Sequence, residues 1–61
     1  MFGIGWARDQ LIAGKKVRRE IWGVRYLFRD AEGVLVFVDV GKVDPWVVQQ
    51  EDVMAMDWML A

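Results

Sequence analysis

The stretch that decides the fold is VRYLFRDAEGVLVFVDV, residues 24–40, which has the clearest pattern in the chain. Residues 24–29 and 34–40 are rich in β-branched and aromatic side chains, which favour strands. The polar loop 30–33 between them ends in glycine, as many hairpin turns do. Both faces of the second segment are largely apolar. We therefore expect a helix to cover one face and a neighbouring subunit to cover the other.

The segments before this hairpin predict a helix and a further strand. Residues 6–13, WARDQLIA, have apolar positions spaced more like a helix than a strand. Gly14 follows, where a left-handed residue commonly ends a helix. Residues 17–22, VRREIW, are bounded by glycines and predict a short strand.

The segment after the hairpin allows two interpretations. Gly41 and Lys42 are expected to end the second strand. Asp44 and Pro45 could then begin a helix, since proline is favoured at the first helical position. Alternatively, residues 43–48 are extended and the helix begins near Gln49 or Gln50. The apolar spacing beyond Pro45 does not form one helical stripe, so we prefer the second interpretation.

The C-terminal residues 57–61 are apolar and short, and they predict a last edge strand. The sequence as a whole predicts a single small α+β domain, residues 1–61. It has an antiparallel sheet, an N-terminal helix and a short C-terminal helix.

The size and composition of the chain predict a homo-oligomer. A domain of 61 residues buries only ~60% of the surface that its unfolded chain exposes, so it needs further support. The chain has no cysteine for a disulfide and no histidine, so we expect neither a metal nor a cofactor. It is 56% hydrophobic and has four tryptophans, more apolar surface than one small core hides. Self-association is the remaining support.

Composition also argues against several functions. The chain contains no Ser, Thr, Cys, His or Asn, so the usual nucleophiles and the imidazole base are missing, and we expect no enzyme. The net charge of −1 argues against nucleic acid as a partner. No apolar run is long enough to span a membrane, and the N-terminus does not have the pattern of a secretory signal. These features predict a cytoplasmic protein.

The residues between Pro45 and Trp58, PWVVQQEDVMAMDW, are dense in groups that suit a flat ligand. This stretch holds two of the four tryptophans, two adjacent glutamines and three carboxylates. Aromatic side chains can stack on a flat ring, and amides and carboxylates can bond its edges and hydroxyls.

Two blocks of the sequence resemble the phage anti-Thoeris sponge family, whose small proteins sequester a host immune signal. The first block lies within residues 6–22 and the second within residues 45–58. The matching residues are Lys15, Lys16, Val17, Arg18, Arg19, Glu20 and Trp22 in the first block and Pro45, Trp46, Gln50, Asp52, Asp57 and Trp58 in the second. The blocks cover about half of the chain and stand in the family's order.

This resemblance implies a small α+β fold that assembles as a homotetramer. It also implies a protein that binds a cyclic ADP-ribose isomer, or in some relatives a cyclic oligonucleotide, without degrading it. The implied location is the cytoplasm of an infected bacterial host. Three departures concern the ligand more than the fold: Ile21 replaces a usual glycine, Gln49 replaces a usual serine, and the region between the blocks is short.

A cyclic, doubly phosphorylated nucleotide needs stacking faces, cations and acceptors for its hydroxyls. The candidate ligand-binding residues are Trp22 and Trp46 for stacking, Arg18, Arg19 and Arg25 for phosphates, Gln50 for the adenine edge, and Asp52 and Asp57 for ribose hydroxyls. Each also has a structural alternative. The two tryptophans can be core or interface anchors, the arginines a solvated sheet edge, Gln50 and Asp52 a solvated helix surface, and Asp57 a local turn.

Two other functions use the same residues. A small protein–protein interaction module with no nucleotide ligand would use the aromatic surface as its contact. A nucleic-acid binder would combine the basic residues 15–19 with Trp22 and Tyr26, although the high acid content argues against it.

Overall fold

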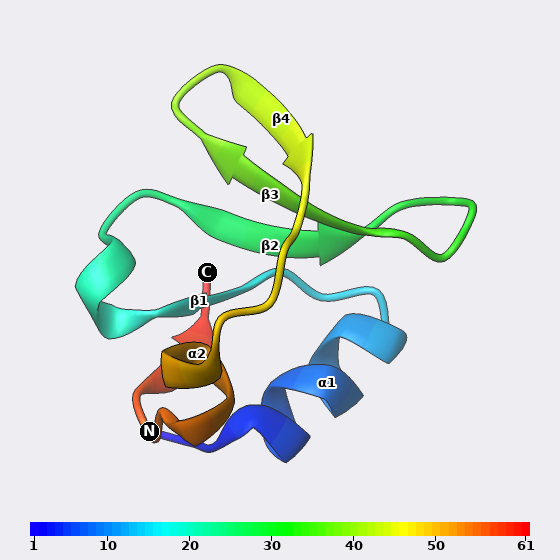
Figure 1. Ribbon diagram of the computed structural model, residues 1–61. Helices are drawn as coiled ribbons and strands as arrows, with labels where there is room; N and C mark the ends of the chain where they lie inside the picture. The colour runs from blue at the N-terminus through cyan, green and yellow to red at the C-terminus, as the bar shows by residue number, and fades with distance from the viewer.

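The computed structural model describes residues 1–61 and contains two α-helices and a five-stranded antiparallel sheet (Figure 1). The helices are α1 (Ile4–Ile12) and α2 (Gln50–Met54). The strands are β1 (Val17–Arg19), β2 (Tyr26–Arg29), β3 (Leu35–Asp39), β4 (Lys42–Pro45) and β5 (Trp58–Leu60). Their order in the sheet is β4-β3-β2-β1-β5. The predicted small α+β fold, with an N-terminal helix and a short C-terminal one, is confirmed. Neither helix has the length and apolar composition that a membrane span requires.

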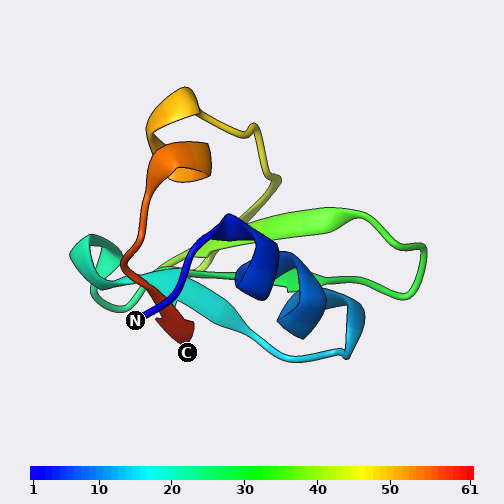
Figure 2. The same cartoon turned by 90° about the horizontal axis from the view of Figure 1, so that it is seen from below.

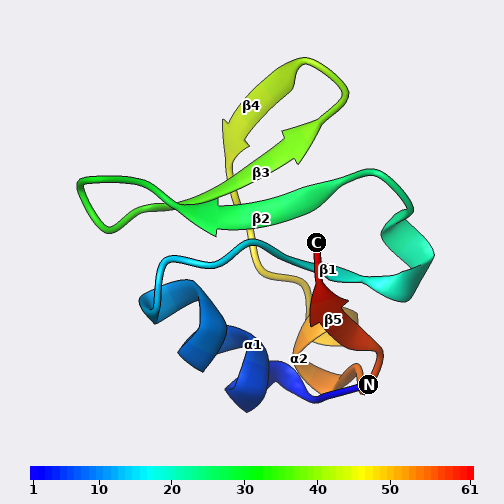
Figure 3. The ribbon, with the colours of Figure 1, turned by 180° about the vertical axis from the view of Figure 1, so that it is seen from behind.

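The core lies between α1 and one face of the sheet. Ala7 and Leu11 of α1 pack with Val17, Leu27 and Trp58, and all five are buried. The last strand joins this core beside the N-terminus, because Phe2 and Trp58 exchange two backbone hydrogen bonds of 2.9 Å. The N-terminus therefore lies beside the start of β5, and β5 then runs away from it along β1, as Figure 3 shows from behind.

The other face of the sheet is apolar and has no helix over it. In Figure 2, α2 and the segment that leads to it lie on one side of the sheet, and no element covers the other side. Strand alternation and register place these residues opposite the core, and we call them the outer face: Arg18, Tyr26, Phe28, Val36, Val38, Val43 and Met59.

The β2–β3 hairpin forms as predicted. Asp30 caps the turn, since its Oδ1 accepts hydrogen bonds of 2.9 Å from the backbone N–H groups of Glu32 and Val34. Gly33 has a φ of 84°, which a side chain would disfavour. The glycine at the end of this loop therefore has the conformational role that the sequence indicated.

The expected break at Gly41 is a tight turn instead. Val40 and Gly41 both have positive φ (38° and 86°), and the chain returns as β4, paired with β3. Two successive residues with positive φ match the right-handed twist of a hairpin. Residues 46–49 then run on to α2 without regular structure, and α2 begins at Gln50. The interpretation with an extended segment before the helix is confirmed, and a helix beginning at Pro45 is wrong.

Two predicted boundaries move because backbone groups find other partners. The predicted strand 17–22 ends at Arg19 and continues as a 3-10 turn, Glu20–Trp22. The N–H of Glu20 donates to the carbonyl of Asp57, and Gly23, with a φ of 67°, reverses the chain. Trp22 is thereby turned toward the core rather than lying on a strand face. The predicted helix 6–13 instead spans Ile4–Ile12.

Candidate functional site

The tryptophans of the two sequence blocks form one aromatic cluster. Trp58 is fully buried at its centre, and its indole Nε1 donates to the backbone oxygen of Asp52 at 3.0 Å. Trp22 and Trp46 each present an edge-to-face contact to Trp58, with centroid distances of 5.1 and 6.1 Å. Phe37 meets Trp22 in the same way at 5.1 Å. Trp58 is therefore a core residue, and the two half-buried tryptophans flank it.

A cavity opens beside this cluster. Its volume is about 310 Å³, and we call it the aromatic cavity. It is lined by Trp22, Phe37, Pro45, Trp46, Val47, Gln49, Glu51 and Asp52. The rings of Trp22 and Phe37 are nearly perpendicular (83°), so they form two walls at a right angle. The arrangement offers flat apolar faces on one side and amide and carboxylate oxygens on the other.

Local structure explains how Trp46 reaches this cavity. Its backbone N–H donates to the carbonyl of Leu35 at 2.9 Å, one step beyond the last residue of β4. Hydrogen bonding thus fixes the start of the segment 46–49, which passes over β2 toward α2 on the near side of Figure 1. The second sequence block begins at the point where the chain leaves the sheet.

Three of the predicted site residues make one ion-pair network. Arg19 Nη1 donates to Asp52 Oδ1 at 3.0 Å, and Arg19 Nε donates to Asp57 Oδ1 at 2.9 Å. The side chains of Arg19 and Asp52 are only 12% and 6% exposed. The network ties β1 to α2 and to the residue before β5. Asp52 therefore does not lie on a solvated helix surface, and Asp57 is joined to a distant strand rather than only to its own turn.

The network shifts two pKa values. The hydrogen bond from Arg19 holds the pKa of Asp57 below its ordinary value, against the opposing effect of burial. The hydrogen bond to Asp57 raises the pKa of Arg19 in turn, again against burial. Both groups are therefore charged at neutral pH.

The other predicted residues lie outside the aromatic cavity. Arg25 Nε donates to the carbonyl of Trp22 at 3.2 Å, and Arg18 Nη1 lies 3.3 Å from the carbonyls of Arg19 and Glu20. Both side chains brace the turn that carries Trp22. Gln50 is exposed at the start of α2, and its neighbour Gln49 lines the cavity instead.

Sequence reasoning named Trp22, Trp46 and Asp52 and missed the remaining lining residues. Phe37 was visible as part of the alternating strand, but nothing in the sequence indicated which face would meet Trp22. Gln49 and Glu51 stand on either side of a residue that was named. The prediction chose Gln50, whereas its two neighbours line the cavity, because the sequence does not show which way each side chain points at the start of a short helix.

Comparison with known proteins supplies the family. No curated protein sequence matches the chain. The family model described as the Thoeris anti-defense 2-like domain (Tad2-like) matches residues 2–61, which is essentially the whole chain and both sequence blocks. Such a match supports a role in phage anti-defence. The chain therefore belongs to the Tad2-like, Thoeris anti-defense 2-like family.

Proposed function

We propose that this protein is a non-catalytic anti-defence sponge that binds and sequesters a cyclic nucleotide-type immune signal, blocking Thoeris-type defence. The ligand class is a cyclic ADP-ribose isomer or a cyclic oligonucleotide. The observation that carries the proposal is the aromatic cavity, which is built from both sequence blocks in a chain of this family.

The walls of the cavity suit a nucleoside. A base placed against Trp22 or Trp46 would gain stacking worth ~1–3 kcal/mol. Gln49 can donate to and accept from a base edge, and the carboxylate of Glu51 can accept from ribose hydroxyls. At about 310 Å³ the cavity is at the lower end of the usual ~300–1,000 Å³ for ligand sites. One chain therefore holds part of a dinucleotide-sized ring and leaves the rest exposed.

The phosphates need cations that one chain does not place in the cavity. None of the residues that line the cavity is basic. Arg19 contacts the lining residue Asp52, but its guanidinium is already bonded to two carboxylates. We propose that Arg25, which lies beside the Trp22 turn, or basic residues of a second subunit supply this charge. Arg18 lies on the outer face, so we propose that it contributes only to a site shared between subunits. A site shared between subunits would also exclude water and strengthen each charged contact.

Self-association is part of the same proposal. The outer face carries β-branched and aromatic side chains that are exposed at Val43 and partly exposed at Tyr26, Phe28 and Val38, and apolar patches of this kind usually mark interfaces. Packing two outer faces together would complete the core on both sides of the sheet, and a homotetramer would bring two such pairs together. A sponge that competes with a host receptor needs roughly nanomolar affinity, about −12 kcal/mol, more than one shallow cavity supplies.

The non-catalytic part of the proposal rests on the side chains present. The aromatic cavity offers carboxylates, an amide and aromatic rings, and the chain has no serine, threonine, cysteine or histidine to attack the ligand. The proposed place of action is the cytoplasm of the infected bacterial host, where the signal is made.

The test is capture and release. The purified protein is mixed with a panel of cyclic ADP-ribose isomers and cyclic oligonucleotides, and unbound compounds are removed by filtration. The protein is then heated, and the released material is analysed by mass spectrometry. We expect one compound to return intact. Loss of a compound with no recovery would mean that the protein is an enzyme, and complete passage of every compound into the filtrate would contradict sequestration.

The second candidate function is a protein–protein interaction module, and the exposed outer face favours it. In that case no nucleotide raises the melting temperature, and a host protein is retained in a pull-down. A variant with Val38→Glu on the outer face would lose that host protein, whereas a sponge would have no host protein to lose.

A further inference from the structure

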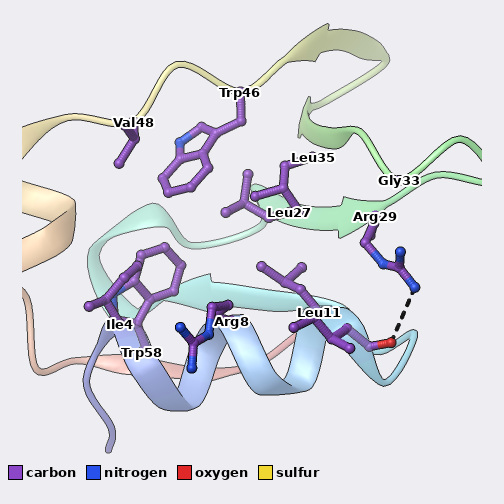
Figure 4. A pocket seen from close by; sticks show the side chains of 11 residues that line it. Ile4, Arg8, Leu11, Leu27, Arg29, Gly33, Leu35, Trp46, Val48 and Trp58 are labelled. Atoms are coloured by element: carbon purple, nitrogen blue, oxygen red, sulfur yellow. Dashed lines mark hydrogen bonds between the residues drawn. The ribbon is translucent and has the colours of Figure 1, made fainter.

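A second cavity lies on the other side of Trp46, between α1 and the β2–β3 hairpin (Figure 4). Its volume is about 340 Å³, and we call it the arginine cavity. Its walls include Arg8, Leu11, Leu27, Arg29, Leu35 and Trp46. The proposed nucleotide site shares only Trp46 with it, and the matching residues of the sequence blocks contribute Trp46 and Trp58.

The interior of the arginine cavity is apolar. Leu11 comes from α1, Leu27 and Leu35 come from neighbouring strands, and Val48 and Trp46 close it from the segment that leads to α2. Water molecules are poorly stabilised in an apolar space of this size, because its walls offer them few hydrogen-bonding groups. The lining atoms also forgo dispersion contacts that an occupant would provide. The interior therefore favours a hydrocarbon or aromatic body.

The mouth of the cavity is positively charged. Arg8 and Arg29 are the only ionisable residues that line it, and no carboxylate does. Arg29 Nη2 donates to the carbonyl of Ile12 at 3.3 Å, which holds its guanidinium against the end of α1 (Figure 4). Arg8 makes only an exposed 3.5 Å contact with Asp9. Both guanidinium groups therefore keep donors for an anion.

The two cavities differ in charge although they share a wall. The aromatic cavity has Glu51 and Asp52 among its lining residues, whereas the arginine cavity has two arginines. A ligand that combines an apolar body with an anionic head matches the second cavity and not the first. We propose that the arginine cavity binds a small amphipathic anion, with its apolar body between α1 and the hairpin and its carboxylate, sulfonate or phosphate at Arg29. Arg8 lies at the other end of the cavity, beyond Leu11, and adds a more distant positive charge (Figure 4). This site is independent of the proposed nucleotide function.

The test uses octanoate and its uncharged analogue 1-octanol as ligands of the full chain. Isothermal titration calorimetry measures both affinities, and methyl NMR follows Leu35 and Val48. We expect saturable binding of octanoate, weaker binding of 1-octanol and shifts at both methyl groups. Arg29→Gln should weaken octanoate binding by roughly fivefold, as expected for a partly exposed charged contact, and Arg8→Gln should weaken it by less. Lys42→Gln, which removes a cation at the β3–β4 turn, should leave it unchanged.

Other outcomes overturn the proposal. Equal affinity for octanoate and 1-octanol, or an unaltered affinity in Arg29→Gln, would mean that Arg29 does not recognise an anion. Sedimentation of the protein with anionic phospholipid vesicles, without binding of free octanoate, would assign the charge to a membrane surface instead. Absence of octanoate binding would show that the cavity has no such ligand.

Discussion

Arg19 Nε lies 2.9 Å from Asp57 Oδ1, although the two residues are 38 positions apart in the chain. The same guanidinium also reaches Asp52, so one side chain of the first sequence block holds two carboxylates of the second. The pairing of basic and acidic residues in the two blocks therefore has a structural basis within one chain. It also places α2, which carries Glu51 and Asp52, at a fixed distance from the sheet.

Removing Arg19 should be severely destabilising. Arg19→Met leaves the buried Asp52 carboxylate unpaired, and breaking a buried pair in this way costs about 3–5 kcal/mol. Urea unfolding followed by circular dichroism measures the loss. The double variant Arg19→Met/Asp52→Leu should recover part of it, because no buried charge is left alone. Asp9→Asn is the matched control, since its pair with Arg8 is largely exposed and should change stability by less than about 0.5 kcal/mol. Additive losses in the double variant would contradict this account.

Acid should destabilise the protein through Asp57. Its pKa is depressed in the folded state, so the unfolded chain binds more protons at low pH. The resulting stability is fully present above the ordinary aspartate pKa of 3.8 and is lost as the pH falls through the lower folded value. The free energy of unfolding, measured by urea titration at a series of pH values, should therefore fall below about pH 4. Asp57→Asn should flatten that slope, and Asp9→Asn should not. Identical slopes in all three proteins would refute the assignment.

Sequence periodicity predicted the elements whose signals are local. The 24–40 hairpin and the edge strand at 57–61 were recovered because alternation and turn residues act over a few positions. The β3–β4 turn was missed because Gly41 followed by Lys42 suggested a break, whereas Val40 also adopts a positive φ. That conformation is uncommon for a β-branched residue and has no sequence signal.

The candidate site was predicted less completely because its geometry is non-local. Trp22 and Trp46 were identified as stacking candidates, and both line the aromatic cavity. The ion pairs of Arg19 with Asp52 and Asp57 could not be read from the chain, since periodicity says nothing of which distant charges meet. The second cavity was missed for the same reason: Arg8 and Arg29 line one cavity only because α1 packs beside the hairpin.

A charge on the outer face should prevent self-association. Val38 lies opposite Tyr26 on β2 and Val43 on β4, near the middle of the apolar band. Val38→Glu would place a carboxylate in the proposed interface, where burial without a partner is costly. Light scattering after size exclusion should show a mass close to the 7.1 kDa of one chain. Met54→Glu, on the exposed surface of α2, is the control and should keep the larger mass. A wild-type protein that is already monomeric would rule out this interface.

Trp46 should be more important for the ligand than a tryptophan of similar exposure elsewhere. Trp46→Leu keeps an apolar side chain over Trp58 but removes the flat face that lines the aromatic cavity. The nucleotide recovered by capture and release should then bind more weakly by about 1–3 kcal/mol, the usual value of one stacked base. Trp6→Leu is the matched control, because Trp6 stacks on Phe2 at 4.2 Å and lines neither cavity. Calorimetry of both variants separates the two roles, with circular dichroism to verify folding. If both folded variants lose affinity equally, the ligand does not stack on Trp46, and the aromatic cavity is not its site.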